Sequence, residues 1–161
     1  MKKILIIEDN FDVRENLSEI LELSNFETVT AKNGKIGVQK ALSEIPDLIL
    51  CDVMMPELDG YGVLNILGKK PKTAEIPFIF LTAKAERNDL RKGMNLGADD
   101  YITKPFDQSE LLEVIERRIK KSERIKKAFD GTDQGLTAFI NEARGQKEIE
   151  KLTEERTIKE Y

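Results

Sequence analysis

The chain has 161 residues, of which 40% are hydrophobic and 35% charged, which suits one globular domain with a proper core and a short appendage. Its net charge of -4 argues against a surface-wide nucleic-acid footprint, and the absence of histidine excludes Ser-His arrangements and the commonest transition-metal ligand. With one cysteine, no signal-peptide pattern and no stretch that approaches a membrane span, we expect a cytoplasmic protein without disulfides or membrane contact.

Short apolar or β-branched runs alternate along the chain with segments in which apolar residues recur at helical spacing. The predicted strands are residues 4–7, 27–31, 48–51 and 77–81, and residues 98–102 lead into a very short fifth strand. The predicted helices contain residues 13–21, 38–45, 62–67 and 90–97, and a capping box at residues 107–110 begins a fifth. The second of these helices keeps Ile45 on its apolar face and stops at Pro46.

Strand and helix alternating five times predict an α/β fold, a doubly wound parallel sheet with helices on both faces. Right-handed crossovers leave few topologies, and we expect the flavodoxin-like (βα)5 arrangement with strand order 2-1-3-4-5. In that order the first and third strands are neighbours. Glu8 and Asp9, which follow the first strand, should therefore lie beside Asp52, which ends the third.

Four of the five strands end in polar groups at the same edge of the predicted sheet. Three carboxylates at short range repel one another, and a hard divalent cation with oxygen ligands relieves that repulsion, so we expect Mg²⁺. Thr82 adds a hydroxyl at the end of the fourth strand, and Lys104 adds an ammonium after the fifth. A metal, a hydroxyl, a lysine and a free carboxylate are what phosphoryl transfer needs, with Asp52 as the nucleophile that forms an acyl phosphate.

Each of these residues also has an ordinary structural interpretation. Asp52 could cap a loop or a helix, and Glu8 and Asp9 could cap the first helix. Thr82 could be a simple strand-end residue, and Lys104 a solvated charge beside a proline turn. Their common placement at one sheet edge favours the site over these alternatives.

Four motifs together resemble the receiver domain of bacterial two-component response regulators, over roughly residues 2–121. Glu8-Asp9 is similar to its acidic pair, and the run from Asp52 to Gly60 to its phospho-acceptor loop. Leu81-Thr82-Ala83 is similar to its strand-four hydroxyl motif, and Lys104-Pro105-Phe106 to its lysine-proline turn. The pair is Glu-Asp here where Asp-Asp also occurs in the family.

The resemblance implies a role for each of these residues. Asp52 would accept a phosphoryl group from a histidine kinase or phosphotransfer protein. The domain would not be an enzyme, but would assist its own phosphorylation and dephosphorylation. Glu8, Asp9, Asp52 and the backbone carbonyl of Met54 would hold Mg²⁺. Thr82 and Lys104 would contact the phosphoryl oxygens, Tyr101 would move inward with Thr82, and the Lys104-Pro105 bond would be cis.

The sequence after the predicted receiver, residues 122–161, is predicted to be a helical extension or linker. The fifth helix continues beyond Lys121 with basic residues around Ile125 and Phe129, and apolar residues at 136–143 predict another amphipathic helix after a break. We interpret the basic run as a solvated helix face. The extension is expected to pack on the fifth helix, to make a homodimer interface together with the fifth helix, or to lead to an absent output domain. DNA would be bound only through that output domain.

Two functions of different classes remain open from the residues. The first is a phosphorylation switch that changes the face formed by the fourth helix, fifth strand and fifth helix. Its output would be transcription in a longer parent protein, or protein-protein contacts if the receiver stands alone. The second is an Mg²⁺-dependent phosphatase with an aspartyl-phosphate intermediate. That enzyme needs a second carboxylate two residues after the nucleophile, where this chain has Met54.

Overall fold

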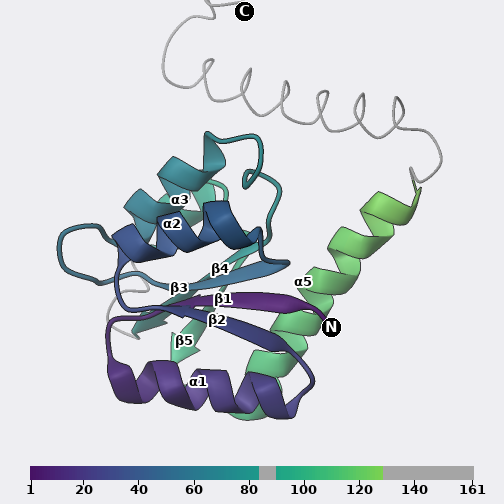
Figure 1. Ribbon diagram of the computed structural model, residues 1–161, viewed down its shortest axis with the longest axis horizontal. Coiled ribbons are helices and arrows are strands. Elements are labelled where there is room, and N and C mark those ends of the chain that lie inside the picture. The colour runs from purple at the N-terminus through teal and green to yellow at the C-terminus, as the bar shows by residue number, and fades with distance from the viewer. Residues whose placement is uncertain (84–89, 129–161) are drawn as a thin grey trace, which may run out of the picture. The chain divides into compact units, whose positions relative to one another are not determined.

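The computed structural model describes residues 1–83 and 90–128 of the chain (Figure 1). The strands are β1 (Lys3–Ile7), β2 (Glu27–Ala31), β3 (Leu48–Asp52), β4 (Phe78–Ala83) and β5 (Asp100–Lys104). The helices are α1 (Phe11–Leu23), α2 (Gly34–Glu44), α3 (Gly60–Gly68), α4 (Leu90–Asn95) and α5 (Gln108–Ala128). None of the helices in these ranges is long and apolar enough to cross a membrane.

The chain divides into a first compact unit, Met1–Lys120, and a second unit, Lys121–Tyr161. Residues 121–128 of the second unit are described and continue α5 as one helix. The amphipathic helix predicted at residues 136–143 lies outside the described residues. The assignment of residues 122–161 as an extension therefore stays a prediction.

The five strands form one parallel sheet in the order β2-β1-β3-β4-β5, which confirms the predicted flavodoxin-like topology. Ile7 of β1 lies beside Cys51 of β3 in the register of the sheet. The residues that follow these two, Glu8 and Asp52, therefore leave the sheet at neighbouring positions. This juxtaposition of segments more than forty residues apart creates the candidate site.

Helices cover both faces of the sheet, with α2 and α3 on one side and α1 and α5 on the other (Figure 1). Alternate residues of each strand face opposite sides, which gives two buried clusters. The α2/α3 side buries Leu5, Ile7, Ile49, Cys51, Phe78 and Phe80. The α1/α5 side buries Ile4, Ile6, Leu48, Leu50, Ile79 and Leu81. Burial on both faces explains why β1, β3 and β4 contain continuous apolar runs without alternation.

Several boundaries differ from the predicted ones, because local signals do not define element ends. β5 begins at Asp100, so residues 98 and 99 precede it, and it extends through Lys104. α4 ends at Asn95, and Gly97, predicted to lie on its apolar face, follows it with a φ of 107°. The capping box prediction is supported at the start of α5, where the Glu110 amide donates to Asp107 Oδ1 at 2.7 Å.

The prediction that Ile45 lies on the apolar face of α2 is wrong. The helix ends at Glu44, because a residue before a proline is disfavoured in the α-helical region. Ile45 takes a left-handed conformation, with φ 44° and ψ 66°, and 44% of its surface is exposed. A β-branched residue in this region is strained.

Ile45→Gly is expected to raise the free energy of unfolding by about 0.5–1 kcal/mol, because glycine adopts the left-handed conformation without a steric cost. Urea denaturation would show a higher midpoint with an unchanged slope. Ser43→Gly, two residues earlier and inside α2, is the matched control and should destabilise by about 0.5 kcal/mol. Equal losses in the two variants would show that Ile45 is not strained.

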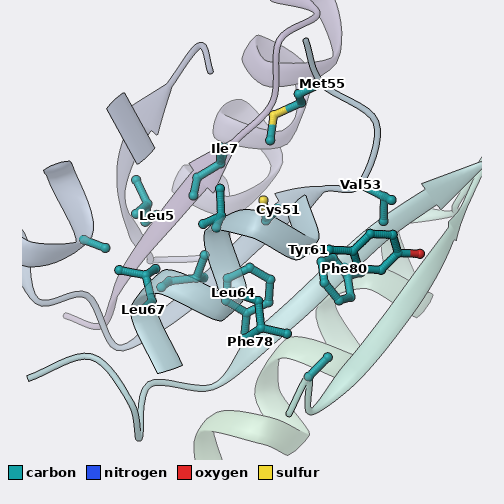
Figure 2. Packing of buried hydrophobic residues seen from close by; sticks show 14 of the residues in the cluster. Leu5, Ile7, Cys51, Val53, Met55, Tyr61, Leu64, Leu67, Phe78 and Phe80 are labelled. Carbon is teal, nitrogen blue, oxygen red and sulfur yellow. The ribbon is translucent and has the colours of Figure 1, made fainter. Parts of the chain in front are cut away.

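The ring of Phe80, on β4, packs against Gly60 of α3 and Gly93 of α4. A Cβ at Gly93 of α4 would lie 2.6 Å from Cε2 of Phe80, and one at Gly60 would lie 3.0 Å from its Cε1. The Phe80 ring also makes edge contacts with Tyr61 and Phe78, with centroid separations of 5.3 and 5.1 Å (Figure 2). Helix α4 lies this close to β4 because residue 93 has no side chain.

Gly93→Ala is expected to destabilise the protein by about 1–3 kcal/mol, since the added methyl overpacks against the Phe80 ring. In a Phe80→Leu background the same substitution should cost less, because the ring edge that it meets is gone. Urea denaturation of the four chains measures this coupling. Gly68→Ala is the control, as a Cβ there meets nothing within 4 Å. An identical cost of Gly93→Ala in both backgrounds would contradict the contact.

Candidate functional site

Two carboxylates and a lysine meet at the carboxyl edge of the sheet. Glu8 directly follows β1, Asp52 ends β3 and Lys104 ends β5. The Lys104 ammonium lies 2.7 Å from Glu8 Oε1 and 3.3 Å from Asp52 Oδ1. Glu8 and Asp52 are only 1% and 6% exposed, whereas 26% of the Lys104 side chain is accessible. The lysine therefore offsets one of two buried negative charges, and Lys104 is not the solvated charge that the alternative interpretation supposes.

Asp9 supplies a third carboxylate to this acidic cluster. One oxygen from each of Glu8, Asp9 and Asp52 lies within 4.8 Å of the others, with Asp9 on the exposed side. A cation with metal-oxygen distances of about 2.1 Å could contact oxygens at nearly this separation after a small adjustment. An all-oxygen donor set that is open on one side fits Mg²⁺, which keeps several waters when bound.

The pKa values of the cluster follow from burial and from the neighbouring charges. Burial first, and then the negative charge of Glu8, raise the pKa of Asp52 to about 7 in spite of the nearby Lys104. Burial would also raise the pKa of Glu8, but hydrogen bonds from its neighbours and the charge of Lys104 outweigh it and the pKa is lowered. Burial opposes the charged form of Lys104, yet both carboxylates raise its pKa. Asp52 is therefore the carboxylate whose charge the metal-free site stabilises least.

Helix capping does not account for the acidic residues. Asn10 is the N-cap of α1, and its Oδ1 accepts from the Val13 amide at 3.0 Å. Asp59 is the N-cap of α3, and its Oδ1 accepts from the Gly62 amide at 2.9 Å. Neither Glu8 nor Asp9 nor Asp52 is the N-cap of these helices, so capping of α1 or α3 does not account for the three residues.

Thr82 lies inside β4 and is fully buried. Within the described part of the chain its hydroxyl oxygen has no hydrogen-bond partner. Alternation along β4 places Thr82 on the same face of the sheet as Phe78 and Phe80. Because Thr82 is near the carboxyl end of β4, it also lies at the edge that carries the acidic cluster, without a hydrogen bond to that cluster. A buried hydroxyl without a partner costs about 1–3 kcal/mol, which an oxygen arriving at the site would recover.

The other predicted site residues lie around this edge. Tyr101 pairs with Phe80 in the register of β4 and β5, is half-buried, and packs against the α2/α3 cluster. Met54 lies two residues after Asp52, with its side chain 62% exposed. The Lys104-Pro105 peptide bond is cis, as the resemblance implied.

The sequence profile of the response regulator receiver domain matches residues 4–116 of the chain. The chain therefore belongs to the receiver domain family of two-component response regulators, whose members are phospho-acceptors rather than classical enzymes. A receiver domain implies a histidine kinase as its partner. The acidic cluster of Glu8, Asp9 and Asp52 fits the phosphorylation site of such a domain.

Among its relatives, the chain is 38% identical over 128 residues to the DNA-binding dual master transcriptional regulator RpaA of Synechocystis sp., covering 80% of this chain and 53% of that protein. It is 40% identical over 122 residues to the alkaline phosphatase synthesis transcriptional regulatory protein PhoP of Bacillus subtilis, covering 76% of this chain and 50% of that one. The chain thus spans about half the length of these curated relatives.

Among solved structures, the chain is similar to the receiver domain of a sensor histidine kinase from Pseudomonas aeruginosa, which has a magnesium ion coordinated in its active-site cleft. The TM-score is 0.69 and the identity 29%, with 74% of this chain and 98% of that one covered. The acidic cluster is of the kind typical of a receiver magnesium site.

The sequence patterns above do not single out Phe11 or Arg14, yet Arg14 bonds the backbone of the acidic pair and Phe11 contacts Arg14. Arg14 Nη1 donates to the carbonyl oxygen of Glu8 at 2.7 Å, and its guanidinium carbon lies 5.5 Å from the centroid of the Phe11 ring. The signal in the sequence is an aromatic and an arginine three residues apart in the first turn of the helix that follows the acids. The same spacing is common on helix surfaces, so only the structure gives it meaning.

Proposed function

We propose that Asp52 accepts a phosphoryl group from the phosphohistidine of a histidine kinase or phosphotransfer protein. The observation that carries this proposal is the buried Asp52 carboxylate, with its pKa raised to about 7, beside two further carboxylates and a lysine. Binding of a phosphoryl group together with a cation would stabilise this site, because the cation offsets the negative charge of the three carboxylates and Lys104 can pair with the phosphoryl oxygens.

In the proposed transfer, an Asp52 carboxylate oxygen forms a bond to phosphorus while the bond between phosphorus and the histidine nitrogen breaks, and the electron pair of that bond stays on the imidazole. Glu8, Asp9, Asp52 and the Met54 carbonyl would hold Mg²⁺, which supplies positive charge to the phosphoryl oxygens. Lys104 donates to one phosphoryl oxygen, and the Thr82 hydroxyl gains the partner that it lacks. These residues also assist hydrolysis of the acyl phosphate.

Movement of Thr82 toward the phosphoryl group would then change the neighbouring face of the protein. Tyr101, in register with Phe80 and on the face of Thr82, turns inward as Thr82 moves. The α4-β5-α5 face includes Asp100, whose Oδ2 accepts from Arg117 and Arg118 at 3.1 Å. Changed contacts on this face alter its affinity for partners, and only such a difference can drive the switch.

The output that we propose is transcription, in a longer protein, since the relatives are transcriptional regulators and this chain spans about half of their length. DNA contact would be made by an output domain outside these 161 residues, in the cytoplasm. We propose a homodimer through α5 and the residues after it, supported by the 37% exposure of Ile125 on a part of the helix rich in basic residues.

The test is the intact mass of the chain after incubation with Mg²⁺ and acetyl phosphate, with light scattering on the same sample. One added phosphoryl group, absent from Asp52→Asn, is the expected result, and the scattering mass shows whether a dimer precedes phosphorylation. A phosphoryl group on the Asp52→Asn variant would overturn the assignment of the acceptor. No added group from either acetyl phosphate or a phosphorylated kinase would favour a docking module instead.

A further inference from the structure

We infer that Arg14, supported by Phe11, is a positioning residue that fixes the β1-α1 loop and thereby the two carboxylates of the acidic pair. The inference rests on the proposed function, because it concerns the residues that would hold Mg²⁺. We refer to Phe11 and Arg14 together as the guanidinium clasp.

The first observation is where Arg14 donates. The Glu8 carbonyl lies beyond the last residue of β1, where the sheet ladder ends, and a half-buried backbone acceptor there needs a donor. Arg14 Nη1 provides it at 2.7 Å, and the same nitrogen lies 3.5 Å from the Asp9 carbonyl oxygen. One guanidinium thus bonds the backbone of both residues of the acidic pair.

The second observation is how the guanidinium itself is held. Phe11 is 63% exposed and belongs to neither core cluster, so its ring is available to a surface partner. Its ring lies under the Arg14 guanidinium, 5.5 Å from centroid to Cζ, as a cation-π pair at three-residue spacing on α1. The exposed ring is therefore explained by its contact with Arg14, which it orients toward the loop.

The third observation is that the loop is restrained from several sides. The Glu8 amide donates to the Ala31 carbonyl at 3.1 Å, and the Asn10 amide donates to Glu8 Oε2 at 3.2 Å. The clasp adds the restraint on the carbonyl side, without which the Glu8-Asp9 peptide could rotate. A rotated peptide would carry the Asp9 carboxylate away from the other two. Groups that orient metal ligands typically change metal affinity by about 10- to 100-fold.

The sign of the effect separates positioning from simple charge. Arg14→Met keeps the apolar stem and removes a cation that lies against the backbone of the acidic pair. If Arg14 acted only through its charge, this variant would bind Mg²⁺ slightly more tightly than the wild type. If Arg14 positions the acidic pair, the variant binds Mg²⁺ about tenfold more weakly.

The experiment is calorimetric titration of the metal-free full chain with Mg²⁺, together with amide hydrogen exchange in EDTA. Arg14→Met is expected to weaken Mg²⁺ binding about tenfold and to speed exchange at the Asn10 amide, with exchange in β3 unchanged. Phe11→Leu should show the same changes to a smaller extent, and Arg14→Lys should restore part of the affinity. Lys35→Met, an equal charge change at an exposed site on α2, is the matched control.

Mg²⁺ binding by Arg14→Met as tight as by Lys35→Met, with unchanged exchange at Asn10, would overturn the clasp. If the wild type binds no Mg²⁺, the proposed function fails, and the exchange measurement still decides whether Arg14 fixes the loop. If the wild type binds Mg²⁺ and is phosphorylated while Arg14→Met is indistinguishable from it in both assays, the inference fails and the proposed function stands.

Discussion

Asp52→Asn is expected to raise the free energy of unfolding of the metal-free protein at pH 8 by roughly 2–4 kcal/mol, because it removes a carboxylate whose ionisation the folded state opposes. Burial and the charge of Glu8 raise the pKa of Asp52 from its ordinary 3.8 to about 7. Above pH 7 the folded protein must hold this charge next to Glu8. A neutral amide at the same position avoids that cost.

The same pKa shift predicts the pH dependence of the wild-type stability. Between pH 4 and about pH 7 the unfolded chain loses the Asp52 proton while the folded chain keeps it, so stability falls as the pH rises. Above pH 7 both states are ionised and the loss is complete. Glu8, with its lowered pKa, contributes in the opposite direction, but that contribution is lost only as the pH falls below its ordinary range near 4.5.

Urea denaturation in EDTA from pH 5 to pH 8 measures the Asp52 effect. The wild type should lose stability across this range and Asp52→Asn should not, so the two curves diverge as the pH rises. At pH 8, Mg²⁺ should reduce the difference in the free energy of unfolding between the two proteins, because it stabilises the wild type more than Asp52→Asn. Asp12→Asn, an exposed carboxylate in the first turn of α1, is the control and should follow the wild type. Parallel curves for Asp52→Asn and the wild type would contradict the raised pKa.

The fold could be predicted from the sequence because three of the strands are short apolar runs and four of the five strands end in polar groups. A parallel sheet buried on both faces produces such runs, and right-handed crossovers then restrict the strand order. Ile45 shows where this reasoning fails. Periodicity places it on the buried face of α2, but the constraint from Pro46 ends the helix one residue earlier and turns Ile45 to the left-handed region.

The candidate site could be predicted as a set of residues, but their contacts could not. Topology brings Glu8 and Asp52 together, and the strand order places Lys104 at the same edge. That Lys104 pairs most closely with Glu8, and that the Thr82 hydroxyl is buried without a partner, depends on side-chain directions that no sequence pattern specifies. The same holds for Arg14, whose bond to the Glu8 carbonyl involves backbone rather than a complementary charge.

Lys104→Met is expected to lower the free energy of unfolding of the metal-free protein by about 3 kcal/mol at pH 8, since removing one partner of a buried ion pair leaves a buried charge without compensation. The Lys104 ammonium lies 2.7 Å from Glu8 and 3.3 Å from Asp52, which are almost fully buried. Methionine keeps the apolar stem of the lysine but not its charge. The two carboxylates then face one another with no cation between them.

A double-mutant cycle with Glu8→Gln separates this ion pair from the packing of the lysine stem. In the Glu8→Gln background Lys104→Met should cost less than half as much, because only Asp52 remains charged, and the difference is the coupling between Lys104 and Glu8. Added Mg²⁺ should reduce the loss in Lys104→Met by restoring positive charge to the cluster. Lys35→Met, with an equal charge change on the surface of α2, should leave stability within about 0.5 kcal/mol of the wild type. An undiminished loss in the Glu8→Gln background would mean that Lys104 stabilises the edge of the sheet through its stem, and that the buried carboxylates are balanced by another means.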